Sequence, residues 1–139
     1  MPVNEFLWPI RVYYEDTDKA GVVYYANYLK FMERARTEWL RAKGYEQDRL
    51  ASVEKILFAV RSLQLDYLKP ALFNQALIVS VKVLTIGKAS MEFEQNVTNA
   101  DGNKELLCTG TVKIACLDAA TFRPAPIPID IYREISSEC

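Results

Sequence analysis

The chain of 139 residues contains no histidine at all. Ser-His-Asp and Cys-His catalysis both use an imidazole as the proton carrier, so both are excluded. Most catalytic zinc sites are excluded as well, because their ligand sets usually include histidine. Any general base in this protein must therefore be a carboxylate, a lysine, a tyrosine or a thiolate.

Cysteine is also scarce, with only Cys108, Cys116 and Cys139 in the whole chain. These three residues show no C-x-x-C spacing, and their odd number argues against a disulfide framework. Cys108 and Cys116 fall in an apolar, strand-like pattern. We therefore interpret these two as small buried hydrophobic side chains rather than as reactive thiols.

An excess of positive charge and long apolar runs are missing too. The formal net charge is −1, which gives no basic surface for nucleic acid. No apolar run reaches the roughly 18 residues that would span a bilayer, and the first residues lack the features of a signal peptide. We expect a cytoplasmic protein that forms one domain over residues 1–139 and has no membrane span.

The apolar pattern predicts one long helix after an initial strand. Residues 5–14 are apolar and β-branched, with Pro9 at the start of a strand or on a sheet edge. In residues 24–44 the apolar positions recur at spacings of three and four, as one buried helix face requires. Gly44 is a plausible stop for this helix. A short helix near residues 46–53 is uncertain.

Strand patterns dominate the second half of the chain. Four segments alternate between apolar and polar residues or are rich in β-branched residues, and they cover 56–70, 76–87, 88–99 and 104–118. The sequence Asp101-Gly102 predicts a tight hairpin turn at 100–103, with positive φ angles. The proline-rich segment 123–130 is expected to be extended and to cover a sheet edge.

One helix followed by a strand meander indicates an α+β protein. The apolar face of the helix needs a sheet to bury it, and a single curved antiparallel sheet around the helix satisfies every element. Cystatin-like and helix-grip folds fit the same pattern nearly as well. The pattern alone does not choose among these folds.

The acidic segment before the helix is the strongest candidate for chemistry. Glu15, Asp16 and Asp18 precede Gly21, which lets the chain fold back. The Asp18 carboxylate would then lie near the unpaired N–H groups of the helix start, which can polarise a carbonyl oxygen. A hydrophobic wall would partly desolvate this carboxylate and raise its basicity, and it would consist of Val22, Val23, Tyr24 and Tyr25.

A purely structural interpretation competes with this one. Aspartate and threonine before a helix most often cap it or form turns, and valines and tyrosines most often belong to the core. Under either interpretation we expect Glu15 and Asp16 to be solvated.

Residues 8–41, WPIRVYYEDTDKAGVVYYANYLKFMERARTEWLR, add a family resemblance. This long gap-free block resembles the 4-hydroxybenzoyl-CoA thioesterase group of hotdog-fold proteins, and most of all its Tol-Pal-associated, YbgC-type acyl-CoA thioesterases. The segment LQLDYLKPA at 63–71 extends the similarity weakly. The resemblance implies a hotdog fold, in which a curved antiparallel five-stranded sheet wraps one long central helix.

The same resemblance implies roles for individual residues. The second aspartate of the D-x-D-x-x-G motif is the catalytic carboxylate of the family, and Asp18 occupies that position. The backbone N–H at the helix start, here that of Tyr25, would polarise the thioester carbonyl. The implied substrate contacts are Gly21, Val22, Val23 and Tyr24, together with Lys88 and Ser90 for the CoA phosphates. Lys88 and Ser90 could equally be ordinary turn surface.

The resemblance implies an acyl-CoA thioesterase for short aliphatic or aromatic acyl groups. Asp18 would act as nucleophile or as general base, without a metal or cofactor. Many relatives have histidine where this chain has Tyr25, and a change of side chain leaves the backbone N–H in place. The alternative is a non-catalytic hotdog module that binds acyl-carrier protein or phospholipid-synthesis enzymes in association with the Tol-Pal system. A dehydratase is disfavoured because that chemistry generally needs histidine.

An oligomer is expected as well. In the family, active sites lie at the interface of a dimer whose two sheets join edge to edge. Long strands between residues 56 and 117 would also leave exposed sheet edges in a monomer. We therefore expect a homodimer or a homotetramer.

Overall fold

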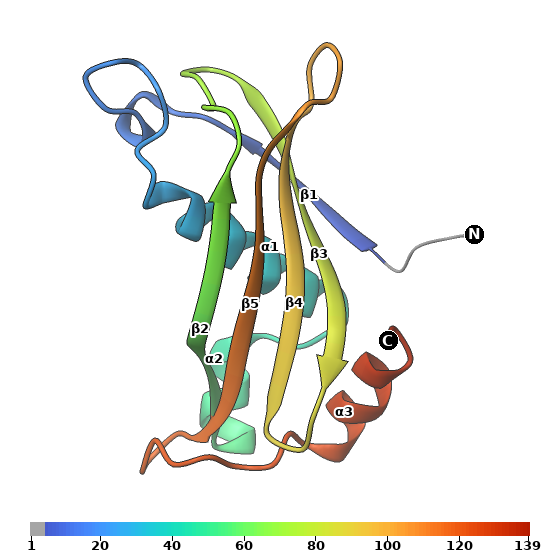
Figure 1. Ribbon diagram of the computed structural model, residues 1–139. Coiled ribbons are helices and arrows are strands. Elements are labelled where there is room, and N and C mark those ends of the chain that lie inside the picture. The colour runs from blue at the N-terminus through green and yellow to red at the C-terminus, as the bar shows by residue number, and fades with distance from the viewer. Residues whose placement is uncertain (1–4) are drawn as a thin grey trace.

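The computed structural model describes residues 5–139. Five strands form one antiparallel sheet in the order β1-β3-β4-β5-β2. The strands are β1 (Glu5–Arg11), β2 (Ile56–Tyr67), β3 (Ala76–Ile86), β4 (Ser90–Asn99) and β5 (Leu106–Asp118). The helical segments are η1 (Tyr14–Asp16), α1 (Asn27–Ala42), α2 (Gln47–Arg49), η2 (Leu50–Glu54) and α3 (Ile129–Ser136). The curved sheet wraps around α1, so the predicted α+β architecture is confirmed (Figure 1).

The core lies between α1 and the concave face of the sheet. Alternate residues of β3 point toward the helix, from Leu77 to Val83, and all of them are at most 3% exposed. The helix buries an apolar face in return, made of Tyr28, Phe31, Met32, Ala35, Trp39 and Leu40. The two-residue alternation of β3 and the three- to four-residue spacing in the helix therefore predicted which face of each element is buried in this interface. No helix in residues 5–139 is long and apolar enough to cross a membrane.

Strand β1 explains the position of Pro9. This strand pairs only with β3, so it is a sheet edge, and Pro9 lies opposite Ile78. An edge strand tolerates proline because one side of its backbone has no neighbouring strand. The strand ends at Arg11 rather than at Tyr14 as predicted, since the chain turns into the short helix η1.

The turn between β4 and β5 differs from the predicted hairpin. Six residues, 100–105, separate the two strands, and positive φ angles occur at Gly102 (65°) and Lys104 (54°) rather than at Asp101. The N–H of Asp101 instead donates to the side chain of Asn99 at 2.9 Å. The side-chain hydrogen bond favours this wider turn over a two-residue hairpin.

The C-terminal tail forms a helix that the proline pattern did not predict. The chain is extended as far as Pro128, with the N–H of Ala125 donating to Cys116 at 2.9 Å. Helix α3 then begins at Ile129, and it buries Ile131 and Ile135 against the core. Alternating prolines restrict only their own conformation and that of the residues preceding them, so they did not determine the conformation of the chain after Pro128.

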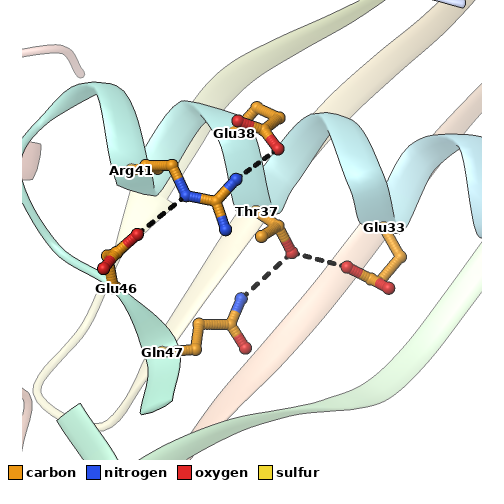
Figure 2. A network of polar contacts seen from close by, with 6 residues as sticks. All are labelled: Glu33, Thr37, Glu38, Arg41, Glu46 and Gln47. Atoms are coloured by element: carbon orange, nitrogen blue, oxygen red, sulfur yellow. Dashed lines mark hydrogen bonds and ion pairs between the residues drawn. The ribbon is translucent and has the colours of Figure 1, made fainter. Parts of the chain in front are cut away.

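The connector after α1 is tied back to the helix by exposed polar contacts. Arg41 pairs with both Glu38 and Glu46, and the side-chain amide of Gln47 donates to the hydroxyl of Thr37 (Figure 2). Exposed pairs of this kind contribute little individually. Their joint effect is to hold the predicted short helical segment, observed as α2 and η2, beside α1.

Candidate functional site

Asp16 anchors the loop that leads into α1. Its carboxylate accepts a hydrogen bond from the N–H of Tyr13 at 2.8 Å, and its carbonyl oxygen accepts from Tyr24 and from the Asn27 side chain. Asp16 is only 8% exposed. The expectation that it would be solvated is therefore wrong, because this residue closes the η1 turn and ties it to the start of α1.

Asp18, two residues later, has the opposite environment. Its side chain is exposed, and its Oδ1 accepts one hydrogen bond, from the N–H of Ala20 at 2.9 Å. The other carboxylate oxygen has no partner within residues 5–139. Asp18 forms a turn but does not cap α1, whose N-cap, Ala26, lacks a side-chain hydrogen bond. Asp18 therefore keeps a carboxylate oxygen available for water or a substrate.

Gly21 closes the same turn. Its N–H donates to the carbonyl oxygen of Asp18 at 3.0 Å, and its φ of +81° lies in the left-handed region that favours glycine. A Cβ atom at this position would meet no atom within 4 Å. Within the single chain, Gly21 is thus explained by its backbone conformation.

Val22 and Val23 fix the loop to the β2–β3 connection. Val22 forms an isolated bridge with Leu72, and the N–H of Val23 donates to Ala71 at 2.8 Å. Val23 is buried in the core. The hydrophobic wall expected around Asp18 is not formed within one chain, since Asp18 remains exposed.

The start of α1 presents free backbone donors. The N–H groups of Tyr25 and Ala26 have no acceptor among residues 5–139. Helix α1 begins at Asn27, and the N–H of Asn27 is occupied by the carbonyl oxygen of Tyr24 at 2.8 Å. The N–H predicted to act, that of Tyr25, is therefore available to a ligand oxygen, and the helix dipole favours negative charge there.

Aromatic side chains surround this helix start. The hydroxyl of Tyr67 donates to the carbonyl oxygen of Tyr25 at 3.0 Å, and the hydroxyl of Tyr28 accepts from the N–H of Ala71 at 3.0 Å. The rings of Tyr25 and Tyr28 meet that of Tyr67 edge-on. The ring of Tyr24 lies beside that of Tyr25 at a tilt of 42°, and Tyr24 is 46% exposed.

A pocket of about 270 Å³ lies beside these rings, lined by Val23, Tyr25, Tyr28, Tyr67, Leu68, Lys69 and Pro70. Burial raises the pKa of Tyr28 and of Tyr67 above the usual value, and Cys108 adds to the shift at Tyr67. Both hydroxyls therefore stay protonated at neutral pH. The pocket offers a mixed aromatic and aliphatic surface, with Lys69 in its lining, beside the helix start.

Tyr28 and Tyr67 were not among the predicted site residues. Tyr28 was predicted only as part of the buried helix face. Tyr67 lies in the segment LQLDYLKPA, whose weak family similarity carried no role for its tyrosine. A tyrosine at the end of a strand, three residues before a proline, is the signal that could have suggested it.

Lys88 and Ser90 lie at the other end of the molecule. Lys88 lies in the β3–β4 turn and Ser90 begins β4, whereas the loop that contains Asp18 lies at the opposite end of the sheet (Figure 1). Lys88 lines a pocket together with Lys55, Ile56 and residues of the C-terminal tail. A single chain therefore has Asp18 and Tyr25 in the same loop and helix start but keeps Lys88 and Ser90 at the other end of the sheet.

A family model described as the thioesterase-like superfamily matches residues 12–135. This chain belongs to that superfamily. The acyl-CoA thioesterase YbgC of Haemophilus influenzae is 41% identical over 128 residues, with 92% of each chain covered. The resemblance to YbgC-type hotdog thioesterases is thereby confirmed.

Solved structures agree with the fold. A probable thioesterase from Bartonella henselae is 34% identical with a TM-score of 0.83, and the match covers 89% of this chain and 99% of that one. A 1,4-dihydroxy-2-naphthoyl-CoA thioesterase from Synechocystis is 23% identical with a TM-score of 0.87, covering 95% and 96%. At that identity the second likeness supports the hotdog fold alone.

Proposed function

We propose that this protein is an acyl-CoA thioesterase in which Asp18 and the backbone N–H of Tyr25 act on the thioester. The observation that carries the proposal is the free N–H of Tyr25 in the same loop-and-helix unit as an exposed carboxylate with an unused oxygen. Membership of the thioesterase-like superfamily supports it.

The chemistry depends on these two groups. The N–H of Tyr25 would donate to the acyl oxygen and stabilise the negative charge that develops on it. In one route, an Asp18 oxygen bonds to the carbonyl carbon, the C–S bond breaks, CoA leaves as thiolate, and water then hydrolyses the mixed anhydride. In the other route, Asp18 removes a proton from a water that attacks the same carbon, and the C–S bond then breaks so that CoA again leaves as thiolate. Both routes need no metal or redox cofactor.

The aromatic pocket supports a compact acyl group. Its volume is about 270 Å³, and a cavity of roughly 150 Å³ is enough to hold benzene. A short aliphatic or aromatic acyl group therefore suits it better than a long chain. Tyr24 and Val22 would contact the same group from the loop, and Gly21 would leave that approach open.

A second copy of the chain would complete the site. Strand β2 is a free sheet edge, and it exposes Val60, Leu63 and Tyr67 by 44–47%. If two β2 strands pair antiparallel about a twofold axis near residues 61–62, Ile56 of one chain lies opposite Tyr67 of the other. The end of the sheet that carries Lys88 and Ser90 would then approach the partner's acidic loop, where the two residues could hold CoA phosphates.

Light scattering tests this arrangement. At micromolar concentration we expect the mass of a dimer or of a tetramer built from dimers. A Val60→Lys and Leu63→Lys double variant should shift the mass toward the monomer and lower turnover in parallel. A monomeric wild-type protein with full turnover would contradict the shared site.

The decisive experiment compares wild type with Asp18→Asn. The substrates would run from acetyl-CoA to palmitoyl-CoA and include benzoyl-CoA and 4-hydroxybenzoyl-CoA. We expect Asp18→Asn to fold normally and to lose turnover by a factor on the order of 10² or more, as loss of one essential polar group typically does. Glu15→Gln is the matched control, because it removes a neighbouring exposed charge and should keep full activity.

A rate above about a tenth of wild type in Asp18→Asn would mean that Asp18 only forms the turn and has no essential role in catalysis. Absence of turnover in both proteins would instead favour the non-catalytic alternative. That alternative predicts stoichiometric binding of acyl-carrier protein or of a phospholipid-synthesis enzyme, with an association with the Tol-Pal system. Calorimetry with acyl-carrier protein would measure it directly.

A further inference from the structure

A second cavity lies between α1 and the strands β2, β4 and β5. It measures about 190 Å³, and its lining includes Arg36 and Trp39 from the helix and Phe58, Phe93 and Ile114 from the strands. None of the groups assigned to the thioester lines it. An engineered apolar cavity of roughly 150 Å³ takes up benzene, so this one can hold a ring or a short alkyl chain.

Arg36 is the unusual member of this lining. The residue is only 9% exposed, and Nη1 donates to the Oε1 of Gln95 at 2.8 Å. No carboxylate lies within 4.0 Å of its guanidinium in residues 5–139. Nε and Nη2 of Arg36 have no hydrogen-bond partner among residues 5–139. Because every fully buried side-chain nitrogen in these residues has a partner, Nε and Nη2 must both retain some accessible surface.

Gln95 cannot balance this charge. Its side chain is completely buried, and its amide nitrogen donates to the carbonyl oxygens of Met32 and Ser80 at 3.0 and 3.3 Å. Gln95 is therefore a neutral partner, fixed by the backbone on both sides. Burial lowers the pKa of Arg36 from its usual value, because desolvation of the cation outweighs the opposing effect of the Glu33 charge.

The nearest acidic side chain in the lining is Glu33, which lies at the exposed rim. Its carboxylate accepts a hydrogen bond from the hydroxyl of Thr37, which in turn accepts from Gln47 (Figure 2). Water screens an exposed carboxylate more strongly than it screens a buried guanidinium. The deeper part of the cavity is therefore positive although one acid stands at its edge.

We propose that this cavity binds a carboxylate anion with a ring-sized or short alkyl body. The carboxylate lies on the free nitrogens of Arg36, which present the fork geometry that carboxylates match. The apolar body lies against Trp39, Phe93 and Ile114. The ligand is a free small acid, and its binding does not depend on the proposed thioesterase function.

Trp39 allows binding to be measured directly. The chain has only two tryptophans, Trp8 and Trp39, so a Trp8→Phe protein reports the cavity alone. In this protein we expect benzoate to quench Trp39 fluorescence with at least tenfold higher affinity than benzamide, its neutral isostere. Arg36→Met should remove this preference, while Glu33→Gln should strengthen benzoate binding by about twofold or more because a repulsive charge is lost.

An independent variant locates the ligand if Arg36→Met folds poorly. Ile114→Phe fills the cavity without touching the guanidinium, and it should abolish benzoate binding at an unchanged unfolding midpoint. Equal affinity for benzoate and benzamide, or benzoate binding that survives both variants, would overturn the proposal and leave Arg36 as a structural partner of Gln95.

The titration is independent of turnover. Failure of the thioesterase function would leave benzoate binding in the Trp8→Phe protein intact, so the two proposals are tested separately.

Discussion

The two ends of the sheet differ in how far their apolar side chains are covered. At the end with the β3–β4 turn, the tail and α3 cover the core, and Ile127, Ile131 and Ile135 are at most 5% exposed. At the acidic-loop end, large apolar and aromatic side chains remain open to solvent, namely Tyr13, Tyr14, Tyr24, Tyr25, Tyr67, Leu68, Leu72 and Phe73. Figure 1 shows α3 at one end and the acidic loop at the other.

This difference indicates that side chains at the tail end mainly stabilise the fold, whereas those at the acidic-loop end are available for binding. The chain uses its own C-terminal segment to close the tail end, whereas no described element covers the acidic-loop end. Contiguous exposed apolar surface usually marks a binding site or an interface. Variants at the tail end should therefore change the free energy of unfolding, and variants at the acidic-loop end should change turnover or association.

The largest stability effect should come from Ile135→Ala at the tail end. Ile135 is completely buried, so truncation removes apolar contacts and leaves a cavity, at a cost of about 2–5 kcal/mol. Urea denaturation measures the change. Activity per folded molecule should be unaffected.

Ile129→Ala is the matched control for this substitution. Ile129 belongs to the same helix but is 58% exposed, so its truncation should change stability by less than about 0.5 kcal/mol. Equal losses for the two variants would show that α3 does not close the core as described.

A smaller loss is expected for Asp16→Asn at the acidic-loop end. The buried carboxylate accepts from the N–H of Tyr13, and a neutral amide there weakens that bond and adds an unpaired donor, at about 1–3 kcal/mol. Glu15→Gln, exposed in the same turn, should leave the unfolding midpoint unchanged. A stable Asp16→Asn protein would contradict the anchoring role of this residue.

A third prediction concerns two buried thiols, one toward each end of the sheet, and tests whether water is excluded from both. In the register of β5 against β2, Cys108 lies opposite Tyr67 near the acidic loop, and Cys116 lies opposite Phe58 toward the tail end. Burial raises the pKa of both thiols from 9.0 to about 11, and Asp66 adds to the shift at Cys108. The folded protein thus keeps both protons where the unfolded chain has released them.

Stability should accordingly fall as the pH rises from 9 toward 11, because the unfolded state binds fewer protons there. At pH 10 each thiol contributes about 1 kcal/mol to this loss. Denaturation of wild type and of a Cys108→Ala, Cys116→Ala variant at pH 8 and pH 10 isolates the effect. An equal pH dependence in the two proteins would mean that neither thiol has a raised pKa in the folded state.

The helix and the sheet could be predicted from the sequence because both depend on repeated side-chain spacings, as from Leu77 to Val83 in β3. Asp18 and Tyr25 could be proposed from motif similarity. The burial of Asp16 could not be predicted, because only the η1 turn makes the environment of Asp16 differ from that of Asp18, two residues later. Tyr67 and Arg36 were missed for a related reason, since their roles depend on partners 42 and 59 residues away.

The smallest expected effect concerns Tyr67 at the acidic-loop end. Its hydroxyl donates to the carbonyl oxygen of Tyr25 at 3.0 Å, in the peptide that contains the Ala26 N–H and directly follows the Tyr25 N–H. Tyr67→Phe keeps the ring against Tyr25 and Tyr28 and removes only this bond, which is worth about 0.5–1.5 kcal/mol. If Tyr67 positions that peptide, kcat should fall by about two- to tenfold, with KM little changed.

Tyr28→Phe separates positioning from simple stability. The Tyr28 hydroxyl also makes one backbone bond, but to the N–H of Ala71 in the β2–β3 connection. We expect Tyr28→Phe to lower the free energy of unfolding without a comparable loss of kcat. Equal effects of the two variants on kcat would mean that the rings and the general order of this end, rather than the hydrogen bond to Tyr25, support the reaction.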